Sequence, residues 1–163
     1  ELRPGIYIIK DGPLKVDRGG SLMGENVGFY LTGDTSKLYF NTQSTVDLTA
    51  PKTGIMAGLL FFSNPKNATM TRTFGAKVLV RGHVIRSDDA RRLVGTVYLP
   101  DDKLVIDGNS PVADKSEYTV IIAKAFQLNN GPNLVLQTDY AASDIPVPDG
   151  VGPMKESSVR LLH

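Results

Sequence analysis

The chain has 163 residues, with 18 Lys and Arg against 17 Asp and Glu, and it contains no cysteine. The formal net charge of +1 offers no basic surface for nucleic acid, and the lack of cysteine excludes disulfide scaffolds and thiolate metal sites. The densest basic stretch, residues 86–92, is interrupted by two aspartates and is interpreted as a solvated turn. This length predicts one domain with a continuous core.

No apolar run approaches the length of a membrane span, and the chain begins at Glu1 rather than Met. We therefore expect a processed or excised piece of a longer protein, with any membrane association made through parts of the parent outside this chain. Cysteine usage does not indicate the redox compartment.

A short strand with a glycine at one end recurs at residues 27–33, 57–64 and 94–100. Other apolar β segments lie between these copies, so extended stretches return every ~20 to 40 residues, as in repeat architectures. The pattern predicts that 27–31, 57–61 and 94–99 are parallel neighbours in successive coils of one sheet.

Helical periodicity is almost absent, and the best candidate, residues 87–92, would form a single turn or a plain loop. The chain is therefore predicted to be all-β, and two architectures are compatible with it. The continuous apolar run at 55–62 favours a single-stranded parallel β-helix with loop insertions. The alternation at 45–48 suits the alternative, an antiparallel β-sandwich or jelly roll.

We expect residues 1–143 to form the β-helical domain and 144–163, which are rich in proline, to be a tail or cap of the same domain. Two polar stretches, 64–74 and 107–117, are expected to be loops that leave the coil, on a side where binding often occurs.

The ends of a short β-helix carry unpaired strand edges, which must be capped or used for association. We expect the N-terminal coil around residues 5–9 to be the end that is used for association. Residues 145–162 are expected to be the cap, because their prolines cannot donate to a β ladder.

Several motifs occur in a characteristic order: PGIY at residues 4–7, GGSLMGENVGFYLTG at 19–33, LTAPKTGIMAGLLFF at 48–62 and GTVYLP at 95–100. In order and spacing they resemble the C-terminal region of TadG-like proteins, which are associated with the Tad (Flp-type) pilus-assembly systems of bacteria. The resemblance extends over residues 4–140.

This resemblance implies an extracytoplasmic β-helical module in the periplasm or on the surface of a bacterium. The module would be a structural or interaction element in pilus assembly or attachment, with other envelope or pilus proteins, and surface glycans, as partners. The family's membrane segment has no counterpart in these residues, and the resemblance supplies no catalytic residue.

Some β-helices are polysaccharide lyases or polygalacturonases, in which aspartates on one face perform acid and base chemistry. The residues to test against that pattern are His83 and the pair Asp88-Asp89. His83 precedes the acidic pair and is followed by Val84 rather than glycine, so the match fails. We predict a solvated acidic turn beside a strand-end histidine. A carbohydrate-binding or polysaccharide-degrading β-helix stays the alternative, and its mark would be several carboxylates that converge within one groove.

Two histidines, His83 and His163, cannot form a three-histidine zinc site. The acidic sequences at 101–102 and 107–109 lack EF-hand spacing and are interpreted as turns, and the glycine-rich segment 19–24 is interpreted as a coil corner rather than a phosphate loop. We therefore predict no catalytic, metal-binding or cofactor-binding residue and no cofactor.

The tyrosines are in or beside the expected strands, and successive coils stack at about 4.8 Å, so one face could carry several in register. Such a ladder could bind sugar rings or a partner protein. Core and edge positions are the more common role for such residues. The tyrosines are Tyr7, Tyr30, Tyr39, Tyr98, Tyr118 and Tyr140.

Overall fold

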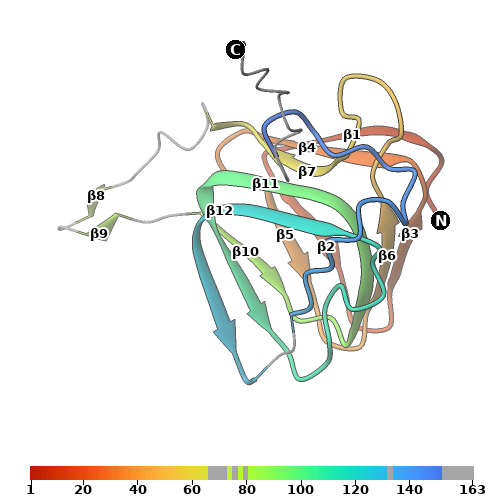
Figure 1. Cartoon of the computed structure of the whole chain (residues 1–163). Coiled ribbons are helices and arrows are strands. Elements are labelled where there is room, and N and C mark those ends of the chain that lie inside the picture. The colour runs from red at the N-terminus through yellow and green to blue at the C-terminus, as the bar shows by residue number, and fades with distance from the viewer. Residues whose placement is uncertain (66–72, 75–76, 79–80, 132–133, 152–163) are drawn as a thin grey trace, which may run out of the picture.

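The computed structural model describes residues 1–65, 73–74, 77–78, 81–131 and 134–151 (Figure 1). Within these ranges no helix is long and apolar enough to cross a membrane. The strands are β1 (Gly5–Lys10), β2 (Pro13–Val16), β3 (Ser21–Gly24), β4 (Val27–Thr32), β5 (Lys37–Phe40), β6 (Thr45–Thr49), β7 (Leu59–Ser63), β8 (Thr73–Phe74), β9 (Lys77–Val78), β10 (Gly82–Ile85), β11 (Asp89–Asp107) and β12 (Thr119–Asn129).

The chain winds as a parallel β-solenoid of about five turns. Each of the first three turns adds a strand to three faces, the last two add strands to faces 1 and 2, and the strands within a face pair in parallel. Face 1 contains β1, β4, β7, residues 95–99 of β11 and residues 119–123 of β12. Face 2 contains β2, β5, β10, residues 103–107 of β11 and residues 125–129 of β12. Face 3 contains β3, β6 and residues 89–94 of β11.

The parallel β-helix predicted from the sequence is therefore confirmed, and the antiparallel sandwich is excluded. The predicted neighbours are also correct, because β4 pairs with β7 and β7 pairs with β11. The same face has two further strands, β1, which begins at Gly5, and β12, which has no glycine.

The interior follows from the alternation of side chains along each strand. Residues at one register position stack through the turns: Phe29 lies opposite Phe61, and Phe61 lies opposite Val97. The ring centroids of Phe29 and Phe61 are 5.2 Å apart, and Tyr7 stacks on Phe29 at 5.6 Å. Columns of inward-facing apolar side chains such as these form one continuous core.

The recurring glycine has a conformational cause where face 3 turns into face 1. Gly58 and Gly95 adopt φ angles of 75° and 128°, a region that L residues rarely occupy. The backbone at Gly95 also comes so close to the second turn that a Cβ atom there would lie 2.6 Å from the Cβ of Ala50.

Residues 87–92 form no helical turn, and the solvated turn expected at 86–92 is limited to the exposed Asp88 and Asp89. β11 begins at Asp89, and Ala90 is fully buried. The arginines of this stretch reach carboxylates on neighbouring turns, which hold them against the body: Arg86 pairs with Asp107, Arg91 with Asp114, and Arg92 with Asp47 and Glu117.

Residues 108–117 form no strand, as expected of a loop, but the expectation that this loop leaves the coil was wrong, because it packs against face 3. The backbone N–H of Ala113 donates to the Ala90 carbonyl at 3.0 Å, and that of Lys115 donates to Arg91 at 2.9 Å. Val112 forms a parallel bridge to Leu134 of the next turn. A different segment, residues 50–58, leaves the coil between β6 and β7.

The expected loop at 64–74 begins where the chain leaves the solenoid after β7, and residues 66–72 lie outside the described residues. The chain rejoins face 2 at β10. In Figure 1, β8 and β9 form an antiparallel pair that lies apart from the body.

The described part of the C-terminal tail lies along the corner between faces 3 and 1. Asp144 pairs with Lys52 at 2.5 Å, the hydroxyl of Tyr118 donates to the Pro146 carbonyl at 2.7 Å, and Ile145 is buried. We name residues 143–148 the strap. The strap does not cover the last turn, whose Phe126 and Leu128 are exposed, and residues 152–163 lie outside the described part.

Candidate functional site

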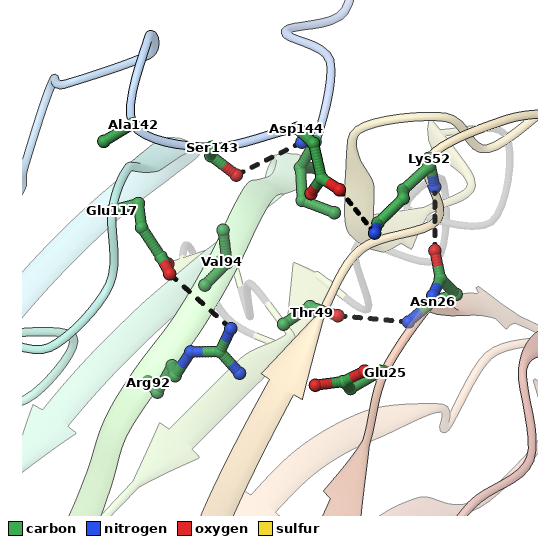
Figure 2. A pocket seen from close by; sticks show the side chains of 11 residues that line it. Glu25, Asn26, Thr49, Lys52, Arg92, Val94, Glu117, Ala142, Ser143 and Asp144 are labelled. Atoms are coloured by element: carbon green, nitrogen blue, oxygen red, sulfur yellow. Dashed lines mark hydrogen bonds and ion pairs between the residues drawn. The ribbon is translucent and has the colours of Figure 1, made fainter.

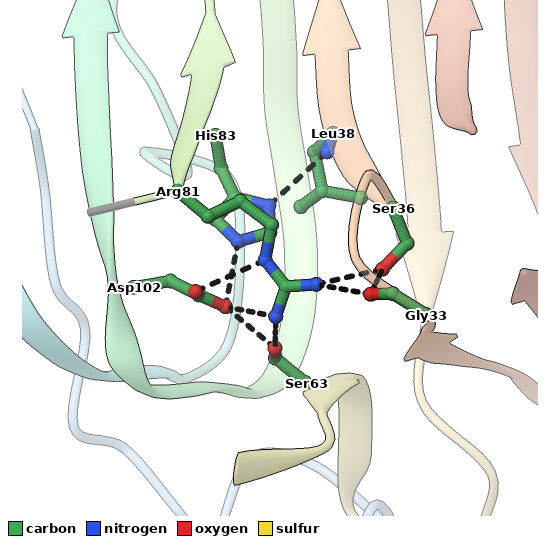
Figure 3. Close-up of polar contacts among 7 residues, drawn as sticks. All are labelled: Gly33, Ser36, Leu38, Ser63, Arg81, His83 and Asp102. Atoms are coloured by element: carbon green, nitrogen blue, oxygen red, sulfur yellow. Dashed lines mark hydrogen bonds and ion pairs between the residues drawn. The ribbon is translucent and has the colours of Figure 1, made fainter. Parts of the chain in front are cut away.

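A buried cluster of charged and polar side chains lies at the corner between faces 1 and 2 (Figure 3). The Asp102 carboxylate accepts hydrogen bonds from Ser63 Oγ at 2.5 Å, from Arg81 Nε at 3.0 Å and from His83 Nε2 at 3.0 Å. The backbone N–H of Leu38 donates to His83 Nδ1 at 3.1 Å. Because Nδ1 accepts a hydrogen bond, the ring is the neutral tautomer that carries its proton on Nε2.

Burial of Asp102 disfavours its charged form. The hydrogen bonds from His83, Arg81 and Ser63 outweigh this effect and hold the pKa of Asp102 below its ordinary value. Asp102 is therefore an ionised carboxylate inside the fold, neutralised by the Arg81 guanidinium at 2.8 Å.

The geometry of this cluster is unsuited to nucleophilic catalysis. The Ser63 hydroxyl donates to Asp102, and this carboxylate is a weak base for the serine proton because hydrogen bonds from His83 and Arg81 lower its pKa. The side chains of His83, Asp102 and Ser63 are 0%, 1% and 2% exposed, which leaves no room for a substrate. The interpretation of 101–102 as a turn and of His83 as a strand-end residue missed this network.

The network connects segments that are distant in sequence. Arg81 Nη1 donates to the Gly33 carbonyl at 3.0 Å and to Ser36 Oγ at 2.8 Å, and Arg81 Nη2 donates to Ser63 at 2.5 Å. Since Ser63 and Arg81 flank the excursion at 64–80, the cluster holds the two ends of that excursion together.

Asp88 and Asp89 are both exposed, as predicted; Asp88 lies in the turn before β11, and Asp89 is the first residue of that strand. Asp88 accepts a hydrogen bond from the backbone of Gln43 at 2.7 Å. The structure does not bring the pair together with His83, which lies inside the core. Among the described residues no group of three or more His, Cys, Asp and Glu side chains could hold a metal ion.

A polar pocket of about 250 Å³ lies between the strap and faces 3 and 1 (Figure 2). Glu117 Oε1 lies 3.6 Å from an Arg92 nitrogen. Glu117 Oε2 is buried and has no hydrogen-bond partner among the described residues. Glu25, Thr49, Lys52 and Asp144 also line this pocket.

The outward side of face 1 carries an aromatic ladder formed by Tyr30, Phe62 and Tyr98. The ring centroids of Tyr30 and Phe62 are 5.8 Å apart with planes at 19°, and those of Phe62 and Tyr98 are 5.3 Å apart with planes at 16°. Ile8 occupies the same register position on β1, next to Tyr30, and it is 67% exposed.

An apolar groove of about 390 Å³ opens beside this ladder. One wall is the loop 50–58, in which Ile55 is 90% exposed. Met56 packs over Gly28, where a Cβ atom would lie 3.2 Å from Met56 Cε, so the glycine lets the loop approach face 1. The groove is lined only by apolar and aromatic residues: Ile6, Ile8, Tyr30, Ile55, Met56, Leu59 and Phe62.

The tyrosines thus divide between the two expected roles. Tyr30 and Tyr98 form the outward ladder, whereas the partly buried Tyr7 stacks on the core residue Phe29 and Tyr118 packs on Tyr140 with centroids at 5.3 Å. Sequence reasoning missed Ile8 and Phe62, although their alternation with inward-facing residues of β1 and β7 was a usable signal.

Comparisons of the chain with protein-family models, with curated proteins and with solved structures found no match.

Proposed function

We propose that this chain is a non-catalytic interaction module that binds an uncharged, apolar peptide segment of a partner protein. The observation that carries the proposal is the groove on face 1. Monomeric proteins seldom expose contiguous apolar surface of this kind unless it serves an interaction. Here Ile8 and Ile55 project from two separate elements into one groove that has no charged lining residue.

The geometry of the ladder favours a peptide over a sugar. Sugar recognition uses the open face of an aromatic ring, but Phe62 is stacked on both sides, by Tyr30 and by Tyr98. The ladder therefore presents ring edges and apolar side chains, which suit the packing of aliphatic and aromatic side chains from a partner.

The resemblance to TadG-like proteins supports an extracytoplasmic role in the bacterial envelope, in pilus assembly or attachment. In a bacterium that makes the parent protein, replacement of Ile8 and Ile55 by serine is expected to reduce piliation or attachment at an unchanged protein level. Unchanged piliation would remove the pilus component of the proposal.

Selection from a phage-displayed library of random peptides tests the binding activity directly. Enriched peptides are expected to be apolar or aromatic, and calorimetry is expected to show at least a tenfold loss of affinity for Ile8→Ser or Ile55→Ser. Met23→Ser is the control, because Met23 is an exposed apolar residue that lies on face 3, away from the groove. Peptides that bind all three variants equally would overturn the proposal.

A second candidate function, the binding of a small glycan, is supported by the unpartnered Glu117 Oε2 in the polar pocket. A sugar hydroxyl could donate to this oxygen. A glycan array with the Glu117→Gln variant as control tests this candidate, and a ligand whose binding is unchanged in that variant would contradict it.

A further inference from the structure

The described chain ends next to the apolar groove. Pro148 Cδ lies 2.9 Å from the position that a Cβ atom on Gly58 would take, and Gly58 directly precedes Leu59, which lines the groove. The backbone N–H of Val151 donates to the Pro148 carbonyl at 3.0 Å, so the chain turns at this point.

The strap holds the tail in this position. Asp144 pairs with Lys52, Ile145 is buried, and Tyr118 donates to the Pro146 carbonyl. Tyr118 immediately precedes the fifth turn, whereas Gly58 begins the third. These contacts place the strap across the corner between Tyr118, before the fifth turn, and Gly58, at the start of the third, beside the first three turns that form the groove.

The sequence beyond Val151 has the length and composition to fill the groove. Twelve residues remain, and they can span about 40 Å when extended, whereas the three strands under the groove cover only about 10 Å. The segment carries four aliphatic or thioether side chains, at Met154, Val159, Leu161 and Leu162, and three of them lie within residues 159–162.

We propose that residues 159–162 dock in the groove of the same chain and thereby compete with a partner peptide. The competition rests on the proposed function, whereas the docking itself does not. A short tether gives the segment an effective concentration on the order of millimolar. A segment with an intrinsic Kd of about 0.1 mM would then lower the apparent affinity of a free peptide about tenfold.

A tryptophan reporter tests the docking, because the natural chain contains no tryptophan. In the full chain, Leu161→Trp is expected to emit at shorter wavelength than Ser157→Trp, a matched position in the same segment. Adding Ile55→Asp, a change at a 90% exposed side chain, is expected to move the Leu161→Trp emission to that of water-exposed indole. Solvent-like emission from Leu161→Trp, or a shift that Ile55→Asp leaves unchanged, would overturn the proposal.

Concentration dependence separates a second copy from the same chain. Docking in cis predicts an emission wavelength that is constant on dilution, and a shift that disappears on dilution would assign the groove to another copy and overturn the proposal. The competition between the tail and a partner peptide is tested with the double variant Leu161→Ser and Leu162→Ser. This variant is expected to bind a selected groove peptide with about tenfold higher affinity than the natural chain. The emission of Leu161→Trp could shift as expected while the selected peptides bind Ile8→Ser and Ile55→Ser as tightly as the natural chain. That result would support the docking and overturn the proposed function.

Discussion

The Nε2 atom of His83 lies 3.0 Å from Oδ2 of Asp102, and both side chains are closed off from solvent. The pair resembles part of a catalytic relay, but the remaining partners give it another role. Arg81 neutralises the carboxylate and Leu38 fixes the imidazole, so the cluster joins turns of the solenoid.

Replacing Asp102 by Asn is expected to lower the free energy of unfolding by about 3–5 kcal/mol, because Arg81 would keep its charge in a buried site without a counter-ion. Urea denaturation measures the effect. Asp88→Asn removes an exposed carboxylate and should change stability by no more than about 0.5 kcal/mol. Equal effects of the two substitutions would show that the buried cluster contributes little to the free energy of unfolding.

Stability is expected to fall in acid partly through Asp102. Its pKa is lowered in the folded state, so its contribution is complete above the unfolded pKa of about 4 and is lost as the pH falls below that value towards the folded pKa. Denaturation curves over this range should show a steeper loss for the natural chain than for Asp102→Asn. Parallel curves would assign the acid sensitivity to other carboxylates.

Gly58→Ala is expected to destabilise the fold by more than Gly54→Ala. Both glycines have positive φ, 75° and 87°, so both substitutions carry a similar backbone cost of about 1 kcal/mol. Only at Gly58 would the new Cβ meet the strap, at 2.0 Å from the Pro146 carbonyl oxygen, whereas nothing lies within 4 Å at Gly54. Thermal unfolding together with proteolysis of the tail measures this difference, and equal effects would mean that the strap is not seated against Gly58.

Thr96→Val is expected to be neutral or to stabilise the fold by up to about 1 kcal/mol. Thr96 is fully buried, and its Oγ1 has no hydrogen-bond partner in the part of the chain that the structure describes. Valine has the same shape without the cost of burying an unpaired hydroxyl. Thr49→Val is the contrasting change, because Thr49 Oγ1 accepts from the Asn26 backbone at 3.0 Å and its loss should destabilise. A destabilised Thr96→Val would indicate that its hydroxyl has a partner.

The sequence predicts the architecture because the solenoid is made of local signals. Glycines 58 and 95 mark a corner that requires positive φ, and the apolar strands that follow them are largely buried. The segment 107–117 failed as a prediction because its composition is that of a loop, while its burial depends on hydrogen bonds to Ala90 and Arg91 on the preceding turn.

The buried cluster was beyond the reach of sequence reasoning. Its members Ser36, Ser63, Arg81 and Asp102 are separated by spacings that the excursion at 64–80 makes irregular, so no period connects them. Asp102 follows another aspartate in a polar corner, and nothing local distinguishes the buried residue from its neighbour. The groove was partly predictable, because its strand residues occupy alternate positions but Ile55 comes from a loop.

Because Ser63 and Arg81 bind the same carboxylate, the two ends of the excursion at 64–80 are held together inside the fold. With the ends fixed in this way, doubling the length of the excursion is expected to cost only about 0.6 kcal/mol of loop-closure entropy. We therefore expect the solenoid to accept an insertion, such as a foreign epitope, between these two anchors without loss of the coils.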